Sequence, residues 1–345
     1  MFEGLAPEAA LDRCQWVKLI CGASNQDLAA IEDLSGIFTL AGVHCIDAAA
    51  DPAVVAAIRR GMAWAGARGA GRPWLMVSLS DGVDPHFRKA WFNPHLCPVR
   101  CSRPCERVCP ALAIGVAVTG VGGVLAERCY GCGRCLPACP HGLIEERGQV
   151  LPGAAVAPLL AQLRPDAVEL HTQPGRAQAF RTRVDQLVAS GIPLRRVAVS
   201  AGLEGTAQSA LELAGELWQR FVVLRSQGLR PLWQLDGRPM TGDVGAGTAA
   251  AAVRLAAAVL PLAPPGPVQL AGGTNAQTLL HLRGRPALRG QIAGVAFGGV
   301  ARRLLQPLLL EAQRRGRPLL ADGVLWPQAL QLAQGLVHPW LEQQL

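Results

Sequence analysis

Eight of the eleven cysteines in this 345-residue chain lie between positions 97 and 139, in two runs of four that each end in Cys-Pro. Cysteines at such short spacing usually bind metal in a reducing compartment, and the metal then organises the chain around it. The runs read Cys97-PVR-Cys101-SRP-Cys105-ERV-Cys109-Pro and Cys129-YG-Cys132-GR-Cys135-LPA-Cys139-Pro.

The second run has the bacterial ferredoxin spacing, C-x2-C-x2-C-x3-C-P, without departure. In ferredoxins the first three thiolates bind one iron–sulfur cube, and the fourth, which precedes proline, ligates the other cluster. A zinc knuckle is the alternative, because paired CxxC units also hold zinc. Zinc would not need the x3-C-P ending in both runs, so we favour iron–sulfur clusters.

The first run departs from that spacing. A complete run would place cysteines at positions 100 and 103, which are Arg100 and Arg103. The spacing C-x7-C-x3-C-P is similar to that of seven-iron ferredoxins, in which one cluster lacks a corner iron. Cys101 lies one residue out of register. It is either a free thiol or a ligand that completes a second cube, and we favour a [3Fe–4S] cluster or interconversion of the two forms.

Cross-ligation between the runs assigns the ligands of the two clusters. One set holds a [4Fe–4S] cluster and the other holds a [3Fe–4S] or second [4Fe–4S] cluster, with Cys101 as its candidate fourth ligand. The first set is Cys109, Cys129, Cys132 and Cys135, and the second is Cys97, Cys105 and Cys139.

Composition limits the other function classes. Half of the residues are hydrophobic and 17% are charged, so a large buried core is expected. The most apolar stretch, 249–260, contains Arg254 and is shorter than a bilayer requires, and the first residues lack the features of a signal peptide. We therefore expect a cytoplasmic protein. The net charge is +8, but no basic stripe with interleaved aromatics is present, so no nucleic-acid partner is expected.

Outside the cysteine block, short apolar segments alternate with amphipathic ones. Such alternation predicts parallel strands separated by helices. Eight units match a TIM-like (β/α)8 barrel, and an open doubly wound α/β sheet is the alternative. The expected strands are 16–22, 44–48, 74–79, 167–171, 196–201, 229–235, 267–271 and 292–297. The expected helices are 27–41, 52–68, 154–163, 176–190, 206–227, 246–260, 275–282 and 300–315.

The cysteine block follows the third expected strand, so we expect a ferredoxin-like module inserted at the barrel mouth. The division is 1–92 and 151–345 for the α/β domain and 93–150 for the module. A glycine-rich hairpin, 112–125, is expected between the two cysteine runs. Polar residues at the expected strand ends outline the mouth, and Asp51 and Thr206 are expected to cap helices. These strand-end residues are Ser24, Asn25, Asp47, Ser80, Asp81, His171, Ser200 and Asp236.

Two glycine pairs follow the last two expected strands. In barrels these loops often hold a phosphate on backbone N–H groups, so flavin mononucleotide (FMN) or a sugar phosphate would fit. Tight turns are the alternative reason for glycine at these places. The candidate residues are Gly272, Gly273, Asn275, Gly298 and Gly299.

Lys18 and Glu169 lie inside otherwise apolar strands, where they are expected to pair in the barrel interior. We interpret that pair as a structural polar layer rather than a catalytic one. Cys14, Cys21 and Cys45 are interpreted as core thiols.

The chain resembles the cyanobacterial light-dependent period (LdpA) family over nearly its whole length. The cysteine block is the most specific part of the resemblance. The other segments are Lys18-Leu-Ile-Cys21-Gly-Ala-Ser-Asn-Gln-Asp27, Ala41-Gly-Val-His-Cys45-Ile-Asp47, Leu170-His171-Thr and Gln234-Leu-Asp236-Gly-Arg-Pro-Met.

The resemblance implies a redox-sensing iron–sulfur protein on the input side of the circadian clock, with one [4Fe–4S] and one [3Fe–4S] cluster. It also implies that the protein responds to quinone or cellular redox state and associates with the input kinase CikA, KaiA and SasA. The alternative is a barrel oxidoreductase that uses both clusters and a flavin. A plain electron carrier ranks last, because it would not need so large an α/β domain.

Overall fold

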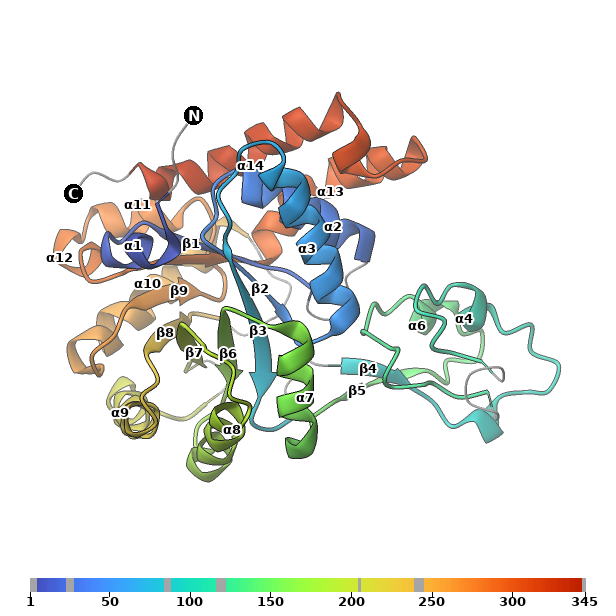
Figure 1. Ribbon diagram of the computed structural model, residues 1–345, viewed down its shortest axis with the longest axis horizontal. Helices are drawn as coiled ribbons and strands as arrows, with labels where there is room; N and C mark the ends of the chain where they lie inside the picture. Colours follow the sequence, from blue (N-terminus) through green and yellow to red (C-terminus); the bar gives the residue numbers. More distant parts are fainter. Residues whose placement is uncertain are drawn as a thin grey trace.

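The computed structural model describes residues 5–22, 28–83, 88–115, 122–203, 206–238 and 245–342. Its centre is a closed barrel of eight parallel strands in the order β1-β10-β9-β8-β7-β6-β3-β2, surrounded by helices (Figure 1). The barrel strands are β1 Trp16–Ile20, β2 Cys45–Ala49, β3 Trp74–Ser80, β6 Ala167–His171, β7 Arg196–Ala201, β8 Pro231–Asp236, β9 Val268–Ala271 and β10 Gly294–Phe297. The barrel prediction is therefore confirmed, and the open doubly wound sheet is excluded.

The helices that follow the strands cover the outside of the barrel (Figure 1). They lie close to the expected positions, although most are one to several residues shorter. They are α2 Leu28–Leu40, α3 Pro52–Gly66, α7 Gly153–Leu163, α8 Ala177–Ala189, α9 Ala210–Ser226, α10 Ala249–Val259, α11 Thr278–Arg283 and α13 Gly299–Arg314. Three further helices, α1 Pro7–Asp12, α12 Pro286–Arg289 and α14 Leu325–Leu341, were not predicted from the sequence.

Only one of the two predicted helix caps is confirmed. The Asp51 side chain accepts from the N–H groups of Ala53 and Val54 at the start of α3. Helix α9 is capped by Ser209 rather than by Thr206, and Ser209 and Glu212 form a reciprocal capping box. Thr206 instead donates its hydroxyl to the carbonyl of Leu203 before the helix begins.

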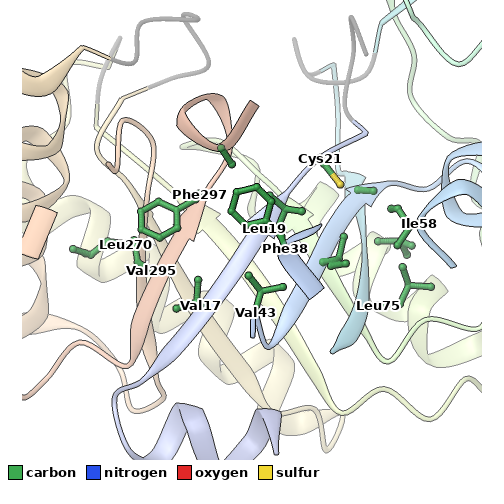
Figure 2. Close-up of a cluster of buried hydrophobic side chains, with 14 of the residues drawn as sticks. Val17, Leu19, Cys21, Phe38, Val43, Ile58, Leu75, Leu270, Val295 and Phe297 are labelled. Atoms are coloured by element: carbon green, nitrogen blue, oxygen red, sulfur yellow. The ribbon is translucent and has the colours of Figure 1, made fainter. Parts of the chain in front are cut away.

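Two hydrophobic layers hold the barrel together. Alternate strand residues point outward against the helices, because side chains alternate along a strand. Figure 2 shows part of this outer layer, with Leu19 and Phe297 from neighbouring strands and Phe38 from α2. The inner layer fills the barrel interior near the starts of the strands, and its largest members are Trp16, Trp74 and Met76.

A two-stranded antiparallel ribbon joins the cysteine module to the barrel. Strands β4 (Arg88–Trp91) and β5 (Glu145–Gly148) pair so that Arg88 faces Gly148 and Trp91 faces Glu145. The guanidinium of Arg147 stacks 3.0 Å from the centre of the Trp91 ring. The chain thus leaves and re-enters the barrel region at one point, and the module extends to one end of the molecule's longest axis (Figure 1). Among the described residues, no helix has the length and apolar character needed to cross a membrane.

Candidate metal centres

The module places six of its eight cysteines around one small hydrophobic core. Its helices, α4 Pro104–Arg107 and α6 Cys135–Ala138, are each a single turn long. Buried Phe92, Ala113 and Ile144 supply most of the remaining apolar contacts. A core this small gives little stability alone, so the module depends on what its thiols bind.

The thiols separate into two sets of four, and one set surrounds a cavity. That cavity is lined by Cys109 from the first run and by Cys129, Cys132 and Cys135 from the second. Burial and the neighbouring thiols of Cys129, Cys132 and Cys109 raise the pKa of Cys135 to about 12. An iron–sulfur core would offset that penalty, because metal binding stabilises the thiolate form.

The other set contains the remaining four cysteines. Burial and the nearby thiol of Cys101 raise the pKa of Cys97, and the Cys139 thiol adds to the shift. Burial likewise raises the pKa of Cys105, with contributions from the thiols of Cys139 and Cys97. Cys101 therefore lies with this set, although its sequence position is one residue out of register.

Backbone N–H groups point at the thiols that cross between the runs. The N–H of Ala113 donates to Sγ of Cys109 at 3.2 Å, and the N–H of Leu143 donates to Sγ of Cys139 at 3.4 Å. Burial opposes ionisation of Cys139, but the N–H groups of residues 141–144 outweigh it and lower the pKa of this thiol. Each crossing cysteine thus has an N–H donor four residues later, and such N–H···S bonds tune iron–sulfur clusters.

Unusual backbone conformations shape both runs. Gly131 and Gly133, at φ of 78° and 75°, let the second run wrap around its cavity. In the first run Arg103 adopts a left-handed φ of 47°, and its N–H donates to Sγ of Cys101 at 3.4 Å. A residue other than glycine is strained in this region of φ, and surrounding contacts must offset that strain.

The donor sets fit iron–sulfur clusters by their chemistry. Each set supplies four thiols, in a compact module whose second run has the ferredoxin spacing. Among the described residues, no three Cys, His, Asp or Glu side chains converge on the position of a single metal ion. The sequence-predicted hairpin between the runs is present where it is described, with Ile114 bridged to Val124. Its tip, residues 116–121 with Gly120, lies outside the described residues.

The first cysteine set adjoins the barrel. Tyr130 is buried and belongs to the main barrel core, and Ala111 and Cys132 pack against that core. Burial raises the pKa of Cys132, while the N–H of Arg134 and the Tyr130 hydroxyl oppose the shift. Tyr130, the one tyrosine of the chain, therefore contacts both a candidate ligand and the barrel.

A buried polar network crosses the barrel interior. Lys18 forms ion pairs with Asp47, at 2.9 Å, and with Glu169. The Gln234 amide donates to Glu169 at 2.8 Å and to Asp236 at 3.1 Å. The predicted Lys18–Glu169 pair is thus confirmed. The network extends through one further hydrogen bond at each end, from Ser78 to Asp47 and from Gln269 to Gln234.

Burial and charge shift the pKa values of the acids in this network in opposite directions. Burial outweighs the attraction of Lys18 and raises the pKa of Asp47 to about 6. Burial and the charge of Glu169 raise the pKa of Asp236 to about 7. Burial opposes ionisation of Glu169, but Lys18 and His171 outweigh it and hold its pKa well below the usual range. His171 lies 3.1 Å from Glu169 and is partly exposed at the strand end.

Other predicted mouth residues have local partners. Ser80 hydrogen-bonds within its own turn, and Asp81 pairs with Arg176 at 3.2 Å. Ser200 is buried at the end of β7. Ser24 and Asn25 lie outside the described residues. Of the three predicted core thiols, Cys21 and Cys45 are buried, whereas Cys14 is only half-buried.

The two glycine pairs have local structural roles. Gly272 and Gly273 have φ of 64° and 90°, and a Cβ on Gly272 would lie 2.4 Å from the carbonyl oxygen of Arg238. The Asn275 side chain bonds within these loops, donating to the carbonyl of Gly245 at 3.0 Å. Gly298 and Gly299 begin α13. These contacts account for glycine in the tight turns, and a phosphate or FMN site there stays a prediction.

Comparison with known proteins identifies both parts of the chain. A family model described as "Light dependent period A C-terminal domain" matches residues 159–339. A second, described as "LdpA Fe-S cluster-binding domain", matches residues 97–150. The protein "Light dependent period A" from Synechococcus elongatus is 45% identical over 338 residues, covering 96% of this chain and 93% of that protein.

The other similarities are weaker: one covers only part of the chain, and two cover most of it at low sequence identity. The arsenate respiratory reductase iron–sulfur subunit ArrB from a Shewanella species is 26% identical over 102 residues, covering 26% of this chain and 43% of that protein. A truncated 3-deoxy-D-arabino-heptulosonate 7-phosphate synthase from Thermotoga maritima is 10% identical, covering 88% of each chain, with a TM-score of 0.42. Phosphoribosyl anthranilate isomerase from the same organism is 10% identical, with a TM-score of 0.36, covering 93% of this chain and 99% of that one.

Proposed function

Because the chain belongs to the Light dependent period A family of iron–sulfur proteins, we propose that it senses cellular redox state and relays it to the circadian clock. The observation that carries the proposal is the separation of eight thiols into two sets of four, one of which lines a cavity against the barrel. A bound iron–sulfur cluster would supply one-electron redox chemistry.

We propose that each set holds one cluster. The cavity set fits a [4Fe–4S] cluster, since all four thiols line one space and belong to the cross-ligation pattern. The second set fits either a [3Fe–4S] cluster on three thiols or a second [4Fe–4S] cluster with Cys101 as fourth ligand. The Cys97–Cys101 contact supports interconversion, because it keeps Cys101 within reach of its set without the regular spacing.

The barrel is the reason to propose a sensor rather than a carrier. Tyr130 and Cys132 connect the first set to the main core, so a change in cluster charge acts on packed barrel residues. The partners proposed through the family are the clock proteins CikA, KaiA and SasA, with quinone as a redox input. We propose a cytoplasmic location, because cysteines grouped to bind metal rather than paired in disulfides are typical of a reducing compartment.

Anaerobic purification followed by iron and sulfide analysis tests the proposal. We expect seven to eight irons per chain, a count set by two such clusters, and different EPR spectra in the oxidised and reduced states. Limited proteolysis of both states is the second measurement, and we expect cluster reduction to change cleavage rates at the β4–β5 ribbon. Stoichiometric zinc without sulfide, or identical proteolysis in both states, would contradict a redox sensor.

A barrel oxidoreductase is the second candidate. The observation that favours it is the ionisable network at the carboxyl ends of the strands, where barrel enzymes carry their active sites. Within that network Asp236 and His171 lie at strand ends and are not fully buried. Flavin released on denaturing the purified protein would favour this function, whereas its absence would leave the sensor as the better account.

A further inference from the structure

The tip of the module, residues 93–109, combines exposed apolar side chains with unpaired positive charge. Val99 is 96% exposed and Leu96 is 64% exposed. The segment contains three arginines and one glutamate, so its net charge is +2. Exposed apolar side chains close in sequence to positive charge are a feature of protein interaction sites.

The charge of the tip is only partly neutralised within the module. Arg103 and Glu106 form an ion pair at 3.2 Å. Arg100 and Arg107 are exposed, and no carboxylate in the described part of the chain pairs with either of them. Two guanidinium groups are thus left to attract an acidic surface.

The tip is also the approach to the second cysteine set. Val99 lies midway between Cys97 and Cys101, two residues from each, so its Cα is at most roughly 7 Å from theirs. The segment between β4 and α4 forms the end of the molecule farthest from the barrel (Figure 1). A protein that covers Val99 would therefore touch the loop that carries two candidate ligands.

We propose that residues 93–109 are the docking surface for a small acidic electron-carrier protein. The inference rests on the proposed iron–sulfur function and adds the class of partner and the face that it meets. Encounters between redox proteins bury less than about 1,200 Å² and rely on charge for steering. The combination of exposed apolar side chains, Leu96 and Val99, with the exposed Arg100 and Arg107 matches the mixed composition of such interfaces.

A second copy of this chain is a poor occupant of the surface. Two tips would bring Arg100 and Arg107 of each copy against like charges, which disfavours association. A membrane surface is also disfavoured, since no helix in the described part of the module is long enough to lie in an interface, α4 and α6 being single turns.

Isothermal titration of the cluster-loaded full chain with an acidic plant-type [2Fe–2S] ferredoxin tests the proposal. We expect binding in 50 mM salt that weakens about tenfold or more in 300 mM salt, because salt screens exposed charges. Arg100→Glu should weaken binding about tenfold and Val99→Ser by a smaller factor. The matched control is Val222→Ser with Arg225→Glu on the exposed face of α9, which should leave binding unchanged.

Several outcomes would overturn the docking surface. The first is that the ferredoxin does not bind, and the second is that the control variant loses as much binding as Arg100→Glu. The others are that basic cytochrome c binds as tightly as the ferredoxin, or that the chain forms a concentration-dependent dimer that Val99→Ser abolishes. Iron and sulfide content is measured on every protein used. Normal content with no salt-sensitive binding would reject the docking surface alone, whereas absence of iron and sulfide in the wild type would reject the proposed function.

Discussion

The thiol of Cys101 lies beside that of Cys97, where burial and this neighbouring thiol raise the pKa of Cys97. The spacing of these two cysteines is one residue longer than in the ferredoxin pattern, and Arg103, two residues after Cys101, adopts a left-handed φ of 47°. The contact places Cys101 with the second set of thiols. On the proposed ligand assignment, ligation by Cys101 would give the second set a fourth iron.

Cys101→Ser should leave the second set with three thiols. We expect iron content to fall by about one atom per chain in protein prepared with iron and sulfide in excess, since a three-thiol set holds a [3Fe–4S] cluster. EPR of the oxidised protein should show the narrow signal of that cluster at full intensity. Cys14→Ser is the control, because Cys14 lies outside the module and hydrogen-bonds to the carbonyl of Gly290. Unchanged iron content and EPR in Cys101→Ser would mean that Cys101 is a free thiol.

Cys132→Ser removes one of four thiols that line a cavity against the barrel core. We expect loss of about one whole cluster and a module that proteases cleave faster, because cluster binding contributes to its folding. The measurements are iron and sulfide content together with limited proteolysis. Cys45→Ser, in the inner layer of the barrel, is the control, and the iron content of this variant should stay at the wild-type value. Equal iron in the Cys132 variant would refute the ligand assignment.

Lys18→Met should destabilise the barrel by about 3–5 kcal/mol, because it leaves Asp47 and Glu169 buried without their shared cation. Urea unfolding followed by circular dichroism measures the change. Adding Glu169→Gln to Lys18→Met should recover part of the loss, since the second substitution removes one of the unpaired charges. If the double variant is less stable than Lys18→Met, the ion pairs are not the source of the effect.

We expect the titration of Asp236 to lower the free energy of unfolding of the barrel as the pH rises from 5 to 7. Its pKa is raised by burial and by Glu169 to about 7, so the folded state keeps a proton that the unfolded chain has lost. The neighbouring groups that oppose this shift are His171, Lys18 and Gln234. The loss is about 2 kcal/mol over this window, from about 1.4 kcal/mol per pKa unit.

Asp236→Asn is the test of that pH dependence. Asparagine keeps the size of the side chain and cannot titrate, so the difference in unfolding free energy between variant and wild type should grow with pH between 5 and 7. Asp47, whose raised pKa acts in the same direction, remains in both proteins and cancels in the comparison. A difference that stays constant with pH would show that Asp236 does not titrate in this window.

The barrel was predictable because its strands carry a strong local signal. Strands buried on both faces are largely apolar, as the consecutive buried residues Leu75, Met76 and Val77 in β3 show, and a helix follows each strand before the next barrel strand. The pairing of Lys18 with Glu169 was predictable for a related reason, since two charges in apolar strands must meet. The cap of α9 was missed because Thr206 and Ser209 are equally good caps by composition, and only the capping box with Glu212 distinguishes them.

The remaining features depend on contacts between distant segments. The β4–β5 ribbon joins residues 54 to 60 positions apart, although its charges carry a signal: Arg88, which is paired with Gly148, contacts Glu146 at 3.4 Å. The link from Gln234 to Asp236 and Gln269 needed the register of β8 and β9. The spacing rule grouped seven thiols but left Cys101 open, because a residue out of register can lie near its set or away from it, and only the fold shows Cys101 beside Cys97.

The β4–β5 ribbon also determines how easily the module can be separated from the barrel. Because Arg88 and Gly148 are directly paired, the two ends of the intervening segment are only about 5 Å apart. A segment with adjacent ends can be acquired or discarded in a single genetic event without separating any barrel strands. The ribbon is therefore the place at which the module can be removed with least disturbance of the barrel, and a short turn grafted across it should regenerate a barrel that closes by itself.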